Sequence, residues 1–258
     1  MTPWLTLEQA LDAPGLRVAP VRAGVPSPWS ELVRACAHVK RIPYALVDAR
    51  DPDRSLGSIK TLTGQASLPV VFWNDERPRS NWLDQLVLLE RIAPDPRLLP
   101  DDPAERARVV GLISELCSEA GFGWHRRVIM IARLLTEPTF GERERVIGHY
   151  LSQKYRHNTD TVEASTKRCE EIVATFGGLA ASGQDYLSGS NLTALDLAWT
   201  AFATLIQPLA EDLCPMKPLW RDLYTWMPSM TPHRTVDALL AFRARIYRDW
   251  LPLPVDLG

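Results

Sequence analysis

The sequence has few cysteines, and their positions do not form a metal site or a redox pair. The four cysteines are widely separated: Cys36, Cys117, Cys169 and Cys214. No two of them form a Cys-x-x-Cys pair, and none has a histidine at a spacing typical of zinc sites. We therefore expect free thiols in a reducing, cytoplasmic environment, no bound metal, and no dithiol chemistry of the thioredoxin kind.

Long apolar runs, a glycine-rich phosphate loop and an excess of charge are also missing. No stretch of about 18 apolar residues is present, so we expect no membrane-spanning helix, and residues 1–13 lack the pattern of a signal peptide. The net charge of -2 gives no indication of binding to nucleic acid or to an anionic membrane. No glycine spacing fits a nucleotide site. With 46% hydrophobic and 23% charged residues, the composition is that of a soluble globular protein.

Proline, by contrast, is abundant, with 21 residues that cluster at the predicted element boundaries. The most informative is Pro69, which precedes the apolar segment 70–73. Proline lacks a backbone donor and fits a strand only at its start, at an edge or at a bulge, so the segment is predicted to be a buried strand that begins after Pro69. Only about 5–6% of X-Pro bonds in folded proteins are cis. The local sequence therefore favours a trans bond, and a cis bond is expected only from the rest of the chain.

Around this strand the pattern alternates between strands and helices. A helix start is well marked, because Ser27 suits the N-cap, Pro28 the first helical position and Glu31 the positive end of the helix dipole. A turn at 74–78, followed by a further strand or turn, comes after the strand at 70–73. The other predicted elements are a helical piece at 6–11, strands at 16–21 and 42–47, and helices at 28–40, within 51–64 and at 81–91. This order is typical of a small α/β unit.

A proline-rich segment at 94–103 separates this unit from a helical second half. Thr193, with Asp196 three residues later, indicates a capped helix that is apolar nearly all round and should form the core of that half. The predicted helices are 104–135 (bent near Gly121 and Gly123), 142–155, 161–179, the capped helix from 194, 217–226 and 235–250. We therefore predict an N-terminal extension (1–15), an α/β domain (16–93), a linker (94–103) and an all-helical domain (104–258).

Three segments, in this order and at these separations, resemble the soluble, cytosolic-type glutathione transferases. Residues 27–34 with 41–44 look like the serine-containing active-site turn, first helix and second strand of that family. Residues 68–71 look like its cis-proline and third strand, and 186–196 like its capped core helix. The resemblance is to a bacterial-like, serine-type member. It implies a thioredoxin-like α/β N-terminal domain followed by an all-α helical-bundle domain.

The resemblance implies a glutathione site at the start of the first long helix. The family places the glutathione sulfur there, and the matching hydroxyl belongs to Ser27, with Ser30 as the alternative. A thiol has a pKa of about 8.5 when free, and a hydroxyl donor together with the helix dipole lowers it. Leu68, before the expected cis-Pro69, would pair its backbone with the cysteinyl part of glutathione. The alternative role for Ser27 is to cap the helix and nothing more.

The other implied glutathione contacts include a departure from the family pattern. The family has an acid followed by serine, which hold the γ-glutamyl end at a helix N-terminus. Here Arg79 stands in place of the acid and Ser80 matches the serine; a shift of one residue gives Ser80 and Asn81, still without an acid. Gln65 is the candidate for the glycyl carboxylate, and Trp29 is also assigned to this site.

The second substrate of the family lies between the domains, against the helix after the linker. The candidates here are Phe122, Trp124, His125 and Met130, for which ordinary helix packing is an equal alternative. His125 stands beside two arginines, which favours a solvated or interface position over a catalytic base.

Two functional hypotheses follow. The first is a transferase that uses glutathione as co-substrate and directs its thiolate at a small hydrophobic electrophile. The second is a non-catalytic binding or assembly module, which Arg79 in place of the acid favours. Because family members are usually homodimers, the resemblance also implies a twofold dimer in which the first domain of one subunit packs on the helical domain of the other.

Overall fold

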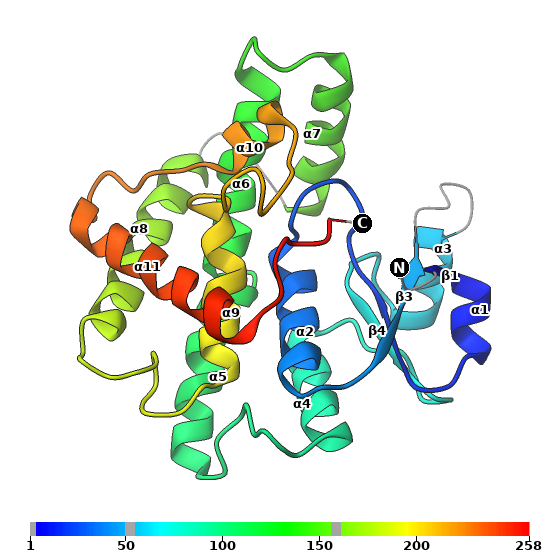
Figure 1. Cartoon of the computed structure of the whole chain (residues 1–258). Coiled ribbons are helices and arrows are strands. Elements are labelled where there is room, and N and C mark those ends of the chain that lie inside the picture. The colour runs from blue at the N-terminus through cyan, green and yellow to red at the C-terminus, as the bar shows by residue number, and fades with distance from the viewer. Residues whose placement is uncertain (1–3, 50–54, 156–160, 258) are drawn as a thin grey trace.

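The computed structural model describes residues 4–49, 55–155 and 161–257, with the side chains of 55–58 left out. Figure 1 shows a small sheet with helices on both faces beside a larger helical body. The strands are β1 (Trp4–Thr6), β2 (Leu16–Ala19), β3 (Tyr44–Asp48) and β4 (Val70–Trp73). The helices of this part are α1 (Leu7–Asp12), α2 (Pro28–Val39), α3 (Ser55–Thr63) and α4 (Trp82–Ile92).

The strand order is β1-β3-β2-β4, with β4 antiparallel to β2 and the other pairs parallel. The alternation of side chains along β4 gives the sheet two buried faces. Val70 and Phe72 join the core formed with α1 and α3, whereas Val71 joins the core formed with α2, α4 and the helical body. The buried strand predicted at 70–73 is confirmed, and its neighbours place α2 between the sheet and the helices (Figure 1).

The N-terminal segment is more ordered than an extension. Residues Trp4–Thr6 pair with Leu46–Asp48 as an edge strand, and α1 follows close to the predicted helical piece. Three residues are too few to show a two-residue period, so the sequence did not predict this strand. After β4, where the sequence left a strand or a turn open, Val71 and Arg79 form one antiparallel bridge, each donating its N–H to the other's carbonyl at 2.9 Å.

The rest of the chain is helical, as predicted. Its elements are α5 (Pro103–Cys117), α6 (Phe122–Thr136), α7 (Glu142–Lys154), α8 (Thr161–Ala180), α9 (Ala194–Phe202), a 3₁₀ turn η1 (Ala203–Leu205), α10 (Pro218–Tyr224) and α11 (His233–Trp250). The long bent helix predicted at 104–135 is instead two helices. A Cβ at Gly121 would lie 2.8 Å from the Glu115 carbonyl oxygen. This close approach of the backbone fits only glycine, and the chain turns there.

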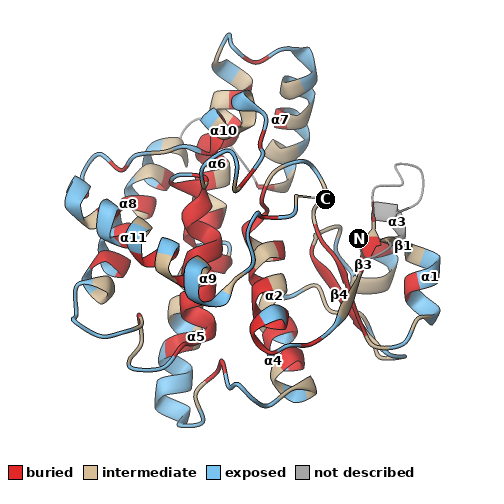
Figure 2. Ribbon diagram, viewed as in Figure 1, coloured by how far each residue is buried: buried red, intermediate tan, exposed pale blue. Residues whose placement is uncertain are grey.

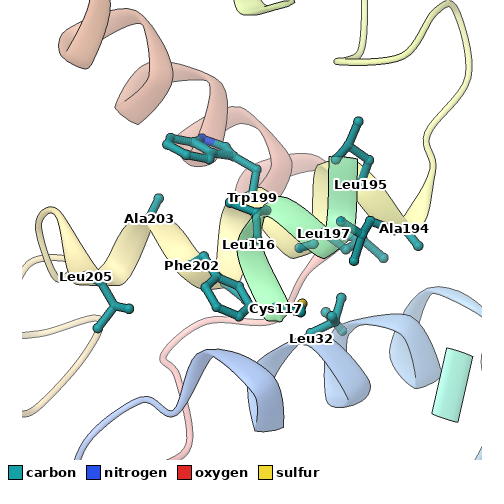
Figure 3. Packing of buried hydrophobic residues seen from close by; sticks show 14 of the residues in the cluster. Leu32, Leu116, Cys117, Ala194, Leu195, Leu197, Trp199, Phe202, Ala203 and Leu205 are labelled. Carbon is teal, nitrogen blue, oxygen red and sulfur yellow. The ribbon is translucent and has the colours of Figure 1, made fainter. Parts of the chain in front are cut away.

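The capped helix predicted from Thr193 is confirmed as α9, and all its residues are buried (Figure 2). The Thr193 hydroxyl accepts the N–H of Leu195 at 3.3 Å, and the Asp196 carboxylate accepts the N–H groups of Thr193 and Leu187, both at 2.8 Å. In Figure 3, side chains of α9 meet Leu32 from α2 and Leu116 from α5. This helix therefore joins the two parts of the molecule in one core.

No helix within the described ranges is both long and apolar enough to cross a membrane. All four cysteines are free and buried.

Candidate ligand site at the start of α2

Ser27 stands at the N-terminus of α2 with its hydroxyl uncommitted. Its backbone is extended, and its carbonyl accepts the N–H of Glu31 at 2.9 Å. Its side chain makes no capping hydrogen bond and, within the described residues, no other one. Capping by the side chain is therefore not the role of Ser27. A hydroxyl without a partner stands where the helix dipole favours negative charge.

The hydroxyl of Ser30, the alternative residue, is hydrogen-bonded to the loop before α2. Its side chain is buried, and its hydroxyl accepts the N–H of Val21 at 3.0 Å. This bond ties the loop to the first turn of α2. The two serines that sequence could not separate thus differ in what their hydroxyls do.

Trp29 fastens the start of α2 to the helical body. Its indole N–H donates to the Cys117 carbonyl at 2.9 Å, and its ring meets Phe202 edge-on with centroids 5.0 Å apart. Gly123 at the start of α6 lies against the same ring. The indole N–H of Trp29 is therefore used within the protein, and these contacts attach the first turn of α2 to the helical body.

The Leu68–Pro69 peptide bond is cis, which confirms the expectation drawn from the whole chain. Ala19, the last residue of β2, pairs with Val70, so the loop that leads to Ser27 begins beside this turn. Gln85 holds the turn from below, since its amide N–H group donates to the carbonyls of Pro69 at 2.9 Å and Arg79 at 3.0 Å. The sequence analysis overlooked Gln85. Its signal is a lone polar residue in the apolar stripe of α4.

Two further predicted residues are brought together. Gln65 donates its amide N–H to the Ser80 hydroxyl at 2.6 Å, although 15 residues separate them in the chain. Asn81, by contrast, caps α4, because its side-chain oxygen accepts the N–H of Leu83 at 2.9 Å. Gln65 and Ser80 therefore form a polar pair, and the side chain of Asn81 is used within the helix.

Arg79 is paired with an acid of its own turn. Its guanidinium lies 2.6 Å from the Glu76 carboxylate, which Arg91 also contacts at 2.6 Å. The hydrogen bonds from Arg91 and Arg79 lower the pKa of Glu76. The acid that the family pattern puts at position 79 is thus not replaced by Glu76, whose carboxylate is shared by two guanidinium groups.

Comparison with known proteins gives structural matches alone. No protein-family model and no curated protein matches the chain. The β-etherase LigF of Sphingobium sp. strain SYK-6 matches with a TM-score of 0.64 at 16% identity, covering 92% of this chain and 97% of LigF. The theta class glutathione S-transferase of Xanthomonas axonopodis pv. citri, solved with glutathione bound, matches with a TM-score of 0.59 at 17% identity, covering 92% and 94%. A glutathione S-transferase of Methylobacterium radiotolerans JCM 2831, in complex with glutathione sulfonate, matches with a TM-score of 0.56 at 19% identity, covering 92% and 94%.

The chain has the glutathione transferase fold. The predicted fold class, a thioredoxin-like domain followed by a helical domain, is confirmed. Identities of 16–19% establish the fold and do not by themselves establish an activity.

The four residues predicted to contact the second substrate pack against different neighbours in the structure. Phe122 is buried against Trp226, with ring centroids 6.1 Å apart, and Met130 is buried within the core. Trp124 meets Tyr155 edge-on at 4.7 Å. His125 lies with its Nδ1 3.0 Å from the Ser165 hydroxyl of α8, and burial, with the charge of Arg168, lowers its pKa. Helix packing accounts for these contacts.

A cavity of about 210 Å³ lies along α2 from Glu31 onward. Glu31 and Arg34 line it together with Tyr247 and the C-terminal segment 251–256. Arg34 bonds to Glu31 at 3.0 Å and reaches Asp256 at 3.4 Å. Burial raises the pKa of Glu31, and Arg34 opposes that shift. This cavity does not include Ser27 or the cis-proline turn, so it is distinct from the candidate glutathione site.

No group of three or more His, Cys, Asp or Glu side chains placed to hold a metal ion occurs in the part of the chain that the structure describes.

Proposed function

We propose that the protein is a serine-type glutathione transferase, which binds glutathione at the start of α2 and directs its thiolate at an electrophilic second substrate. The observation that carries this proposal is the Ser27 hydroxyl, which has no partner among the described residues and lies at the N-terminus of α2. The fold, shared with structures solved with glutathione or glutathione sulfonate bound, supports the ligand.

The chemistry requires stabilisation of a thiolate. Ser27 donates its hydroxyl hydrogen to the glutathione sulfur, and the N-terminus of α2 adds its positive dipole end; both lower the pKa of the thiol. Ser30 is the less favourable donor, because its side chain is buried and its oxygen already holds the Val21 N–H of the preceding loop. With the thiolate formed, catalysis consists of holding the electrophile beside it.

The rest of glutathione is proposed to lie along the cis-proline turn. The Leu68 backbone pairs with the cysteinyl unit in strand-like fashion, and Gln85 keeps this turn rigid from its buried side. Gln65 and Ser80 exchange their mutual hydrogen bond for bonds to the ligand's polar ends. Arg79 departs from the family pattern and provides no acid for the ligand's amino group, so we expect weak binding of glutathione.

The proposal extends to the form of the protein in the cell. We propose a cytoplasmic homodimer in which the first domain of one subunit packs on the helical domain of the other. Sedimentation velocity at micromolar concentration tests it. A single species with the mass of two chains is expected, and a monomer would show that this part of the proposal is wrong.

Calorimetric titration of glutathione into the full chain tests the proposed ligand, and turnover tests the activity. Saturable binding with one ligand per chain is expected, with oxidised glutathione and γ-glutamylcysteine as comparison ligands. The electrophile panel should include activated aryl halides and aryl ethers, because one structural match is a β-etherase. Absence of both glutathione binding and conjugate formation would contradict the proposal. The remaining hypothesis would be a non-catalytic binding or assembly module.

A further inference from the structure

The first two turns of α6 carry two neighbouring arginines that the glutathione site does not use. Arg126 is 1% exposed, although sequence analysis placed this stretch on a solvated or interface face. Its Nε donates to the Leu205 carbonyl at 2.9 Å, and its Nη2 lies 3.5 Å from the Tyr224 carbonyl. Its Nη1 is buried without a hydrogen-bond partner. Burial of an unpaired donor on a charged group is costly, so this side chain calls for an explanation.

Arg127 is half-buried and surrounded by tyrosines. Its Nη2 donates to the Tyr224 hydroxyl at 3.1 Å, and its guanidinium carbon lies 5.1 Å from the centre of the same ring. Tyr155 lies close enough that its hydroxyl, together with that of Tyr224, raises the pKa of Arg127 against the effect of burial. Lys154 places its ammonium group 5.6 Å from the Tyr155 ring. We call Arg126, Arg127, Lys154, Tyr155 and Tyr224 the arginine–tyrosine cluster.

The cluster holds three cationic side chains and no acid. Arg126, Arg127 and Lys154 form no ion pair with an aspartate or glutamate of the described residues. Burial lowers the pKa of Arg126 to about 9, with the charges of Arg127 and Arg133 acting in the same direction. Buried cations in proteins are ordinarily paired. An anion bound at the cluster would offset this positive charge.

The position of the cluster connects it to the thiol site. Gly123, one turn before Arg126 and Arg127 on α6, lies against the ring of Trp29, two residues from Ser27. Residues three and four apart are neighbours on a helix, about 5–6 Å from one another. The cluster thus begins about one turn beyond the contact between α6 and the start of α2. Lys154 is the last residue of α7, Tyr155 directly follows it, and Tyr224 is the last residue of α10. Figure 1 shows α7 and α10 beside α6 in the helical body.

Access differs among the members. Arg127 and Lys154 are half-buried and can be reached from outside, whereas Arg126 and Tyr224 lie behind them. The Arg127 guanidinium uses one N–H of Nη1 on the Met130 sulfur at 3.6 Å and one of Nη2 on the Tyr224 hydroxyl at 3.1 Å. Its remaining N–H groups can bond the two oxygens of a carboxylate. The buried Arg126 adds positive potential behind this surface.

We infer that the arginine–tyrosine cluster binds a carboxylate group of the second substrate, and that the protein acts on electrophiles that carry such a group. The inference rests on the proposed function, because the reaction at the electrophilic carbon of the substrate is that of the proposed transferase. It replaces the purely hydrophobic electrophile expected from the sequence.

A pair of probes that differ in charge tests the inference. 4-Chloro-3,5-dinitrobenzoate and its carboxamide present the same reactive carbon. The thiolate sulfur forms a bond to that carbon, the carbon–chlorine bond breaks, chloride leaves with the electron pair, and the thiol proton goes to solvent. In the unmodified protein we expect the benzoate to have a KM at least about 10-fold below that of the carboxamide, the effect of one charge-assisted contact. Equal KM values would overturn the inference.

Variants then assign the preference to the cluster. Arg127→Gln should remove the preference, raising KM for the benzoate about 10-fold or more while KM for the carboxamide stays within about twofold. Arg127→Lys should retain part of it. The matched control is Arg133→Gln on the same helix, since Arg133 is paired with Glu137 and Asp222, and it should change neither KM. An equal effect of Arg127→Gln on both probes would contradict a carboxylate site.

A binding measurement separates this inference from the glutathione proposal. 3,5-Dinitrobenzoate and 3,5-dinitrobenzamide have no leaving group, and their quenching of tryptophan fluorescence needs no glutathione. Preferential binding of the benzoate, lost in Arg127→Gln, would support the cluster even if glutathione failed to bind. Binding of glutathione without any preference between the two probes would leave the transferase and remove the carboxylate site.

Discussion

The indole ring of Trp29 lies so close to Gly123 that a Cβ atom at position 123 would stand 2.8 Å from the ring carbon Cη2. Real Cβ atoms do not approach other atoms so closely, and this ring is itself held by its bond to the Cys117 carbonyl. The contact between the start of α2 and the start of α6 is therefore fixed by the absence of a side chain at one residue.

Gly123→Ala should consequently disturb both stability and the site. The added methyl group would also meet Phe202, so we expect a loss of about 1–3 kcal/mol in the free energy of unfolding and weaker binding of glutathione, measured by urea denaturation and calorimetry. The control is Gly111→Ala in α5, where an added Cβ meets nothing within 4 Å. That change should stabilise the chain by about 0.5–1 kcal/mol. A neutral Gly123→Ala would show that the domains can shift at little cost.

Ser27 and Ser30 should respond differently to removal of their hydroxyls. Ser27→Ala loses no capping bond, so its free energy of unfolding should change little, whereas turnover should fall about 10²-fold if the hydroxyl stabilises the thiolate. The pKa of the bound thiol, followed by the ultraviolet absorbance of the thiolate, should rise in this variant.

Ser30→Ala provides the contrast. It leaves the part-buried Val21 N–H without its acceptor, and loss of such a hydrogen bond costs about 0.5–1.5 kcal/mol of stability. The thiol pKa should be unchanged as long as the loop keeps its position. A raised thiol pKa in Ser30→Ala together with an unchanged one in Ser27→Ala would transfer the proposed role to Ser30.

Local signals in the sequence were sufficient for most elements. The Pro69 start of β4, the start of α2 and the capping box of Thr193 and Asp196 depend on neighbouring residues, and the structure has all three. The edge strand β1 is too short to show a period. The break at Gly121 depends on a close approach of backbone that no pattern of side chains reveals.

The candidate site was less predictable, because side-chain partners come from distant parts of the chain. Whether Ser27 or Ser30 has a free hydroxyl is decided by the loop residue Val21, and Gln65 meets Ser80 only when the sheet has formed. Arg126 carries a charge, which suggests a surface position, yet packing against α10 and Trp226 buries it. A sequence pattern shows which residue types are present. It does not show which residues their side chains contact in the folded chain.

We expect Gln85 of α4 to stabilise the cis-proline turn through its side-chain hydrogen bonds. Gln85→Leu keeps the size of the side chain and leaves the buried Pro69 carbonyl without its donor. It also removes one of the two donors to the Arg79 carbonyl, which still accepts the Val71 N–H. We expect a loss of about 1–3 kcal/mol in stability and a higher Kd for glutathione. Val87→Gln on the exposed side of α4 is the control and should remain within about 0.5 kcal/mol with an unchanged Kd. If the Kd stays constant in Gln85→Leu, the turn does not need this support.

The Glu170 carboxylate should make stability depend on pH. It accepts hydrogen bonds from the segment 229–231, including the N–H of Met230 at 3.0 Å and the N–H and hydroxyl of Thr231 at 3.1 and 2.9 Å. Burial alone would raise the pKa of Glu170, but these bonds outweigh it and lower the pKa below its ordinary 4.5. The unfolded chain therefore binds the proton more tightly, and folding is favoured when the carboxylate is ionised.

The contribution of Glu170 is thus present above about pH 4.5 and is lost as the pH falls through the lower folded pKa. Glu170→Gln should destabilise the chain by about 1–3 kcal/mol at pH 7, and the difference from the unmodified protein should shrink in acid. Urea denaturation between pH 7 and pH 3 measures it. Glu171→Gln is the control, since its carboxylate is about half exposed and should show little dependence. A difference for Glu170→Gln that is constant across this range would mean that the hydrogen bonds do not distinguish the ionised from the neutral form.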